Sequence, residues 1–258
     1  MRLRARGISP GIGRGDALVM EEAFSFLGGV DAETGELRLE GRDESVRERV
    51  LVFPSGKGST VGSYVILDLE RRGMAPAAIV NTEAEPIVAT GAVMAGIPMV
   101  DDVDATLIRD GDTVIVDADA GTVELPDVVE VQVVTSILRS GGEVLILKRS
   151  QKVRSYKGMW AGVSGSIKAG EEPLEAAMRE VFEEVGPDRV SLVMSGEPLR
   201  MRDGEVVWVV HPFLFEMECR EVEMDWEHVD CRWINASHIA EYDAVPGLDD
   251  VYRRLGLL

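Results

Sequence analysis

The chain has 258 residues and carries a formal net charge of -19 at pH 7. This length suits two medium-sized domains better than one large one, and a hydrophobic content of 45% is enough to build their cores. So acidic a chain repels a nucleic-acid backbone and an anionic membrane, so we expect neither a nucleic-acid polymer nor a membrane as its main partner. The same acidity makes clustered glutamates a weak sign of a site.

The start of the chain, MRLRARGISP, contains no apolar run of signal-peptide length. No later run approaches the roughly 18 apolar residues of a membrane span, so we expect a soluble, cytoplasmic protein. Cys219 and Cys231 are the only cysteines, too few and too far apart for a zinc or iron–sulfur site. Both are predicted to be ordinary buried thiols.

Short β-rich segments alternate with helical segments over about residues 38–125. The sequence predicts strands in RVLVFPS, AAIVNTE and DTVIVDAD, a helix around VGSYVILDLERRG, and a separate Gly/Ala-rich stretch in VATGAVMAG. This alternation is typical of a mixed β/α domain. Pro126 and its acidic neighbours mark the predicted boundary, which gives domains at 1–126 and 128–258.

The second domain is predicted to open with a β-hairpin and to continue into an amphipathic helix. The strands EVQVVTSIL and EVLILKRS flank a turn at Gly141-Gly142. Pro173 suits the first turn of the helix. Five apolar residues recur at helical spacing and are predicted to form its buried stripe, namely Leu174, Met178, Val181, Phe182 and Val185.

Three glutamates share the opposite face of this helix. At about 100° per residue, Glu180, Glu183 and Glu184 fall close together around the helix axis. Without a metal the three carboxylates repel one another. A bound divalent cation makes the cluster favourable, because magnesium and manganese prefer hard oxygen ligands. A pair of glutamates alone, in so acidic a chain, would more often be a solvated helix face.

The wider spacing makes a metal site the better interpretation. Gly165, Glu171 and the run Arg179-Glu180-Val181-Phe182-Glu183-Glu184-Val185-Gly186 reproduce the signature of the Nudix hydrolases. The chain from about residue 128 to its end resembles that family, whose members are α/β/α sandwiches that cleave a diphosphate joined to another moiety, using Mg²⁺ or Mn²⁺. Pro187 departs from the signature, where the family prefers an aliphatic residue. We expect it to alter the helix exit rather than the ligands.

The resemblance implies a role for each residue of this box. Glu180, Glu183 and Glu184 would hold the divalent ions, Gly165 would let the backbone approach a metal, and Glu180 is the candidate general base or orients the base water. Supporting positions are Arg179, which would orient a carboxylate, Glu171 of the signature, Gly186 at the turn after the helix, and Glu227 as a further ligand from a loop.

The tryptophans leave the substrate open. Trp160 lies just before the box, where it could stack on a base or an apolar tail, although a core role is equally compatible with the sequence. Trp226 and Trp233 are predicted to be packing residues.

Residues 1 to 125 resemble the small subunit of the aconitase X group, whose archaeal members include phosphomevalonate dehydratase. The resemblance rests on three long stretches, FLGGVDAETGEL, VFPSGKGSTVGSYVILDLERRGMAPAAIVNTEAEPIVATGAVMAGIPMVD and DGDTVIVDADAGTVEL. It implies a swivelling β/α domain that acts on mevalonate 5-phosphate with a separate large subunit, which brings an iron–sulfur cluster. The absence of cysteine before Cys219 agrees with a cluster carried by the partner.

In this resemblance Ser59 is the proton acceptor of the dehydration. A serine alkoxide forms only with nearby donors, which Gly58 and its neighbours could supply from the backbone and Lys57 from its ammonium group. In the alternative, Ser59 caps the helix that begins near Val61. A nucleotide-binding P-loop is excluded, since it would need glycine at position 51, where the chain has Leu51.

The sequence thus predicts a fusion of two α/β domains. One is a Mg²⁺- or Mn²⁺-dependent hydrolase of a small-molecule diphosphate, and the other is a dehydratase small-subunit-like domain of archaeal-type isoprenoid synthesis from mevalonate. The alternative is a nucleotide diphosphatase whose swivel domain only binds or regulates.

Overall fold

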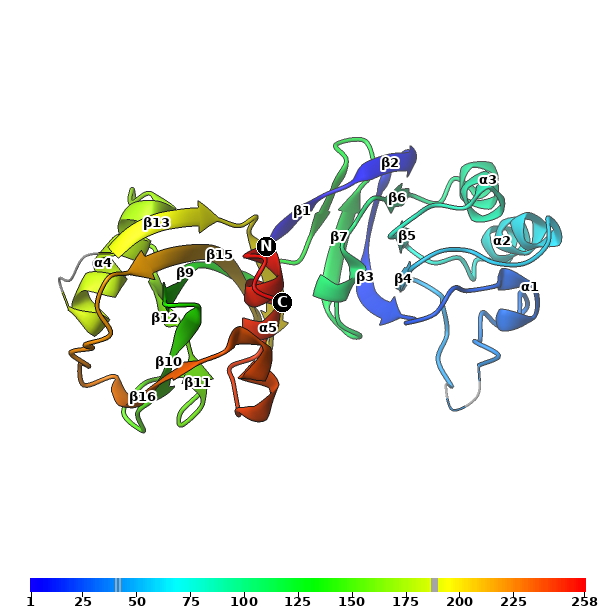
Figure 1. The fold of residues 1–258 in the computed structure, drawn as a ribbon. Helices are drawn as coiled ribbons and strands as arrows, with labels where there is room; N and C mark the ends of the chain where they lie inside the picture. The colour runs from blue at the N-terminus through cyan, green and yellow to red at the C-terminus, as the bar shows by residue number, and fades with distance from the viewer. Residues whose placement is uncertain (40, 42, 187–189) are drawn as a thin grey trace. The chain divides into compact units, whose positions relative to one another are not determined.

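The computed structural model describes residues 1–39, 41, 43–186 and 190–258, so the expected effect of Pro187 lies outside the described residues. The chain divides into two compact units, Met1–Val129 and Glu130–Leu258. Figure 1 follows the chain through both of them. Within the described part of the chain, no helix is both long enough and apolar enough to cross a membrane.

The first unit is built on a mixed sheet with the strand order β1-β8-β7-β3-β4-β5-β6-β2. Its strands are β1 (Arg2–Arg4), β2 (Arg6–Ser9), β3 (Ile12–Val19), β4 (Val50–Phe53), β5 (Ala78–Asn81), β6 (Met99–Asp101), β7 (Thr113–Asp117) and β8 (Thr122–Glu124). The four central strands β3 to β6 run parallel. Strands β4 and β5 are buried along their whole length, as expected for parallel strands covered on both faces.

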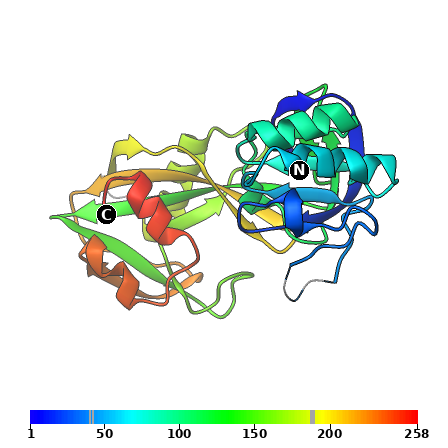
Figure 2. The same cartoon turned by 90° about the vertical axis from the view of Figure 1, so that its right-hand side faces the viewer.

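The helices of the first unit are α1 (Phe26–Gly29), α2 (Val61–Arg71), α3 (Pro86–Ala95) and the 3₁₀ turn η1 (Ala105–Leu107). The predicted helix is confirmed as α2, and the Gly/Ala-rich stretch forms α3. These two helices lie side by side (Figure 2) because Gly91 leaves no room for a side chain: a Cβ there would lie 2.6 Å from Ile66 Cδ1. The Glu85 side chain caps α3 by accepting hydrogen bonds from the amides of Ile87 and Val88.

The second unit is built on an antiparallel sheet, also of eight strands. Its path is β11-β10-β9-β15-β13, with β12 paired to β9, β14 to β15 and β16 to β10. The strands are β9 (Val129–Ser140), β10 (Glu143–Arg149), β11 (Trp160–Ala161), β12 (Val163–Ser166), β13 (Val190–Ser195), β14 (Leu199–Asp203), β15 (Val206–Met217) and β16 (His228–Ile234). The predicted hairpin is confirmed: Gly141 and Gly142, both at positive φ, close the turn between β9 and β10.

Helices cover both faces of this sheet, which confirms the predicted α/β/α sandwich. They are α4 (Pro173–Val185), the 3₁₀ helix η2 (Ala236–Glu241) and α5 (Leu248–Arg254). Alternate residues of β10 point to opposite sides, since Val144 and Ile146 join the core with η2 and α5, whereas Leu145 and Leu147 join the core with α4. Each face therefore has its own core.

Helix α4 begins at Pro173 as predicted, but its buried face differs from the prediction. Val181 and Val185 are buried, whereas Leu174, Met178 and Phe182 are 36%, 51% and 61% exposed. The sheet-facing side consists of Ala176, Ala177, Val181, Glu184 and Val185. Small alanines let the helix lie close to the sheet, and a buried glutamate takes the place of an apolar residue. The predicted stripe was therefore wrong in three of its five members.

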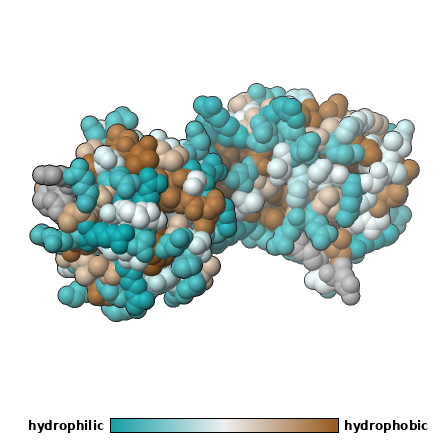
Figure 3. Space-filling view, viewed as in Figure 1, coloured by the Kyte–Doolittle hydropathy of each residue, from teal (hydrophilic) through white to brown (hydrophobic). Residues whose placement is uncertain are grey.

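The two cysteines also differ from the prediction. Cys219, which follows β15, and Cys231, on β16, are both free thiols that are only partly buried. On the face shown in Figure 3, hydrophilic side chains are interspersed with apolar ones on each unit.

The boundary at Pro126 stays a prediction with a direct test. Both cores of the second unit consist of residues between positions 133 and 257, so residues 128–258 alone contain a complete set of packing partners. We expect this fragment to be soluble and to unfold in one cooperative transition by circular dichroism. An insoluble fragment, from a full chain that is soluble, would show that the first unit completes its core.

Candidate active sites

The end of β12 meets α4 without space for a side chain. A Cβ built on Gly165 would lie 1.9 Å from both Cδ and Oε1 of Glu180. While the carboxylate of Glu180 stays in this volume, only glycine fits at position 165. The glycine of the sequence signature thus makes room for the first of its helical glutamates.

Arg179 connects three carboxylates. Its Nε and Nη2 donate to the two carboxylate oxygens of Glu171 at 2.7 and 3.0 Å, and its Nη1 donates to Glu180 Oε1 at 2.5 Å. Glu183 Oε2 lies 3.6 Å from the same Nη1. The bond from Arg179 is the main reason that the pKa of Glu171 falls to about 2. Arg179 therefore fixes the position of Glu180 through a rigid two-pronged contact with Glu171.

Glu184 is the buried member of the set. It is 4% exposed, its Oε1 accepts a long hydrogen bond of 3.4 Å from the Ser164 amide, and its Oε2 is buried without a hydrogen-bond partner. Burial, and then the charges of Glu180, Asp225 and Glu227, raise its pKa well above 4.5. A carboxylate in this position is poorly compensated by the protein itself.

The nearest possible cation is a histidine that carries no charge at neutral pH. His228 Nε2 lies 3.6 Å from Glu184 Oε2, and its Nδ1 lies 3.2 Å from Asp225 Oδ1. Burial lowers the pKa of His228 despite the opposing effect of Asp225. The ring therefore stays neutral at pH 7 and leaves the charge of Glu184 unpaired.

These residues fit a divalent cation, although they do not yet converge on one point. Among the described residues, no three acidic, histidine or cysteine side chains are placed to hold one metal ion together. Glu183 in particular is 55% exposed, and its Oε2 lies near Arg179 Nη1. The donors are nonetheless hard oxygens, and a cation beside the unpartnered Glu184 Oε2 would relieve both the missing contact and the repulsion.

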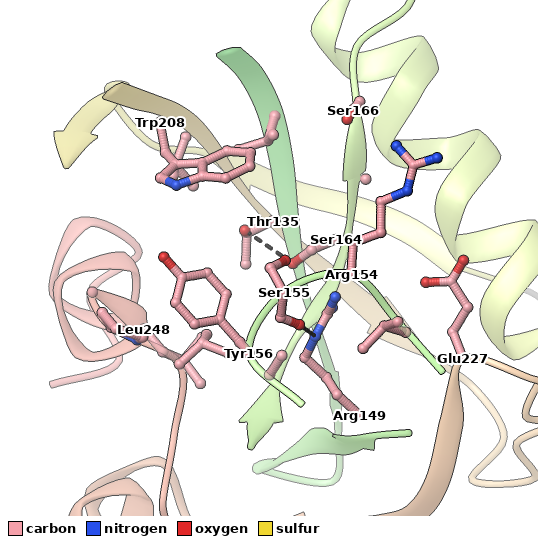
Figure 4. A pocket seen from close by; sticks show the side chains of 18 of the residues that line it. Thr135, Arg149, Arg154, Ser155, Tyr156, Ser164, Ser166, Trp208, Glu227 and Leu248 are labelled. Carbon is pink, nitrogen blue, oxygen red and sulfur yellow. Dashed lines mark hydrogen bonds between the residues drawn. The ribbon is translucent and has the colours of Figure 1, made fainter. Parts of the chain in front are cut away.

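A cavity of about 680 Å³ opens beside this cluster. Its acidic end is lined by Glu180 and by Glu227, Ser164 and Ser166, of which the last three are labelled in Figure 4. The end of β10 and the segment that follows it contribute three cations to the wall, Arg149, Lys152 and Arg154. In a chain of charge -19, three cations on one wall of a cavity favour an anionic ligand.

One of the three tryptophans considered in the sequence, Trp226, is placed differently from the prediction. Trp226 is 60% exposed and lines the cavity, so its predicted packing role was wrong. Trp160 is 6% exposed and packs edge to face against Tyr242, with ring centroids 5.4 Å apart, so of its two predicted roles the core role holds. Trp233 packs against the core beneath α4, as predicted.

The second candidate site is the loop between β4 and α2. Lys57, Gly58 and Ser59 are exposed there, and Gly58 has a φ of 118° that favours glycine. Ser59 Oγ accepts a hydrogen bond of 3.4 Å from the Val61 amide. Helix α2 has Thr60 as its N-cap residue and no side-chain cap bond. The cap role of Ser59 therefore rests on one long contact.

Comparison with known proteins identifies the first unit. The aconitase X swivel domain matches residues 2–125. The phosphomevalonate dehydratase small subunit of Thermococcus sibiricus is 53% identical over 130 residues, which cover 49% of this chain and all of that protein. Through its first unit, the chain belongs to the aconitase X swivel-domain family. Thermococcus kodakaraensis aconitase X, a crystal structure of the holo-form, is 49% identical over 48% of this chain and 98% of that one, with a TM-score of 0.47.

The NUDIX domain matches residues 129–255. Among solved structures, a MutT protein from Methanosarcina mazei Go1 is 22% identical and covers 50% of this chain and 94% of its own, with a TM-score of 0.44. The chain is thus a fusion of an aconitase X swivel domain and a NUDIX domain.

Within the NUDIX domain, the structure adds two residues that the sequence analysis missed. Asp225 Oδ1 accepts the amide of Glu227 at 2.9 Å and lies beside His228, so both residues belong to the surroundings of Glu184. Both residues lie in the run DWEH, in which the sequence analysis considered only Glu227 as a metal ligand. Gly186, by contrast, ends α4 at a φ of 96°, as the predicted turn requires.

Replacing Gly165 by alanine should displace Glu180. The new Cβ and the carboxylate cannot occupy the same volume, and the flexible glutamate can turn away, so folding should survive. We expect diphosphate hydrolysis to fall about tenfold or more, because Glu180 would leave its contact with Arg179. In a Glu180→Ala background the same change should have no further effect, since no carboxylate is left to displace. A full additional loss there would contradict this role for Gly165.

Proposed function

We propose that the NUDIX domain hydrolyses a diphosphate linkage in a small molecule with Mg²⁺ or Mn²⁺. The observation that carries this proposal is Glu184, a buried carboxylate without a partner for Oε2, in a cluster of like charges beside a cavity. A protein rarely retains such a group unless a ligand compensates it.

Glu180, Glu183 and Glu184, with the backbone near Gly165, would hold the metal. When bound, the ion would neutralise the diphosphate and lower the pKa of an attacking water. Glu180 lines the cavity and is held by Arg179, so it is placed to accept a proton from that water or to orient it. Glu227, which lines the same end of the cavity, would be a further ligand.

The test uses the full chain and a panel of diphosphates, with nucleoside diphosphates, nucleotide sugars and prenyl diphosphates among them. We expect release of phosphate or of a phosphorylated product from at least one compound with Mg²⁺ or Mn²⁺, and none with an excess of chelator. Hydrolysis of no compound on the panel would contradict the proposal.

We further propose that the swivel domain acts as the small subunit of a dehydratase for mevalonate 5-phosphate. Support comes from the relative of 53% identity, which aligns over its full length, and from the exposed loop at Lys57, Gly58 and Ser59. A separate large subunit would bring the iron–sulfur cluster, and this domain would close on it. The fusion would then belong to archaeal-type isoprenoid synthesis.

The competing function is a nucleotide diphosphatase whose swivel domain only binds or regulates. Affinity purification of the full chain from its own cells separates the two. A large dehydratase subunit, recovered in stoichiometric amount, supports the dehydratase. Recovery of the chain without it favours a binding domain.

A further inference from the structure

Helix α4 carries a row of apolar side chains that stay exposed. Leu174, Met178 and Phe182 recur every fourth residue, so they fall within about 80° of one another around the helix axis. They are 36%, 51% and 61% exposed. This set, here called the α4 row, runs for about 12 Å along the helix. Single exposed apolar residues are ordinary, whereas three neighbours in one row make an apolar strip.

The α4 row lies beside the core beneath the helix. Val181 and Val185, which are next to the row around the helix, pack in that core with Phe215 of β15. Leu192 of β13 pairs opposite Phe215, so its side chain points to the same side of the sheet, and it is 45% exposed. The side of the sheet that α4 covers therefore has exposed apolar side chains on both the helix and the last strand of the sheet.

The rest of the exposed side of α4 is acidic. Glu172, just before the helix, and Glu175 and Glu183, on it, are exposed. The one cation of the helix, Arg179, is only 20% exposed, and its guanidinium group is held by two other glutamates. Among the described residues of α4, no exposed side chain is therefore cationic. Residues 172–186 contain five glutamates and this one arginine.

This charge decides which occupant fits the apolar strip. A second copy of the chain would bring the same excess of carboxylates to a two-fold contact, and an anionic lipid surface would bring phosphates, so both are repelled. A peptide helix with an apolar face and lysine or arginine beside it would bury the strip and also pair with the carboxylates. Such helices bind through anchors three or four residues apart, which matches the spacing of the α4 row.

We propose that the α4 row is a docking surface for a cationic amphipathic helix of a partner protein. The apolar face of that helix covers Leu174, Met178 and Phe182, and its basic residues lie against Glu172 and Glu175. Phe182 is the main anchor because it offers the largest apolar area, and the unbranched side chain of Met178 adapts to the shape of the partner. The proposal needs no residue of the metal site, so it stands apart from the hydrolase activity.

The test measures binding of a fluorescein-labelled peptide of about 18 residues, with leucine and lysine at amphipathic helical spacing, to the full chain. Fluorescence anisotropy at about 0.15 M salt gives the Kd. A scrambled peptide of the same composition should bind at least about tenfold more weakly, and a peptide with glutamate in place of lysine should not bind. Phe182→Ser should weaken binding of the amphipathic peptide about tenfold, because it removes the main anchor.

The matched control is Tyr64→Ser. Tyr64 is an aromatic residue on α2 of the first unit, and its exposure of 64% is close to that of Phe182. This substitution should leave the Kd unchanged. Met178→Ser is a second variant in the α4 row and should also weaken binding. Circular dichroism and thermal unfolding check that each variant folds.

Equal affinity for the amphipathic and the scrambled peptide would overturn the inference, as would an unchanged Kd in both Phe182→Ser and Met178→Ser. Light scattering and vesicle sedimentation test the other occupants. A wild-type dimer that Phe182→Ser dissociates would assign the α4 row to self-association and overturn the proposal. Binding to vesicles of phosphatidylcholine and phosphatidylserine, abolished by Phe182→Ser, would assign the row to a membrane and overturn it equally.

Discussion

Replacing Glu184 by glutamine should lower diphosphate hydrolysis at least about a hundredfold, on the order of 3 kcal/mol of transition-state stabilisation. The amide keeps the shape of the side chain but loses the negative charge that would hold the metal. Initial rates at low and at saturating Mg²⁺ measure the effect, and the loss should be largest at low Mg²⁺. A matched control is Glu197→Gln, an exposed glutamate between β13 and β14, which should leave the rate unchanged. Full activity of Glu184→Gln at low Mg²⁺ would contradict the metal site.

The same substitution should stabilise the metal-free fold, in a manner that depends on pH. The folded pKa of Glu184 is raised above its ordinary value of 4.5, so the folded state takes up a proton more readily than the unfolded chain. Wild-type stability therefore falls as pH rises from 4.5 through the folded pKa. With chelator at pH 7, we expect Glu184→Gln to be about 1 kcal/mol or more stabler than the wild type, and near pH 4 the difference should vanish.

Added Mg²⁺ should make the wild type more stable than Glu184→Gln. A ligand that binds only the folded state raises its stability, and the wild-type chain retains the charge that binds it. Thermal unfolding at pH 7, with and without Mg²⁺, measures the difference in stability between the two proteins under each condition. A wild type that is stabler than the variant even in chelator would mean that another group compensates Glu184.

Local patterns predicted the framework of the NUDIX domain well. The hairpin at Gly141-Gly142 needs only two glycines between alternating strands, and the start of α4 needs only Pro173 before an apolar repeat. Both depend on neighbours in sequence. The spacing of Gly165 to Glu180 also had a visible signature, although its reason, a carboxylate in the volume of a missing side chain, appears only in three dimensions.

The buried face of α4 could not be predicted from the same rules. Hydrophobic periodicity assigns Phe182, the largest apolar residue of the helix, to the core and Glu184 to water. The fold does the opposite: Phe182 is 61% exposed and Glu184 is 4% exposed. Such a conflict between local preference and structure is typical of functional positions. The cavity beside Glu180 was equally hidden, because it is assembled from segments far apart in sequence.

In the first unit too, the sequence predicts some features, and others follow only from the structure. Its strands and α2 follow from composition, while the exposure of the loop at Ser59 follows from where β4 ends. The long contact to Val61 supports only a weak capping role, since a good cap bond is shorter. The two interpretations of Ser59 therefore predict different effects of its removal on dehydration and on the free energy of unfolding.

Replacing Ser59 by alanine should abolish dehydration of mevalonate 5-phosphate by the full chain mixed with its large subunit. As the proton acceptor, the Ser59 hydroxyl would be lost, whereas association with the large subunit and diphosphate hydrolysis should persist because they use other residues. Thr60→Ala is the matched control: it removes the neighbouring hydroxyl, which makes no cap bond, and should leave dehydration intact. If Ser59→Ala instead weakens folding by about 1 kcal/mol and dehydration continues, the serine is a helix cap. If the wild-type mixture does not dehydrate the substrate at all, the swivel domain serves binding rather than catalysis.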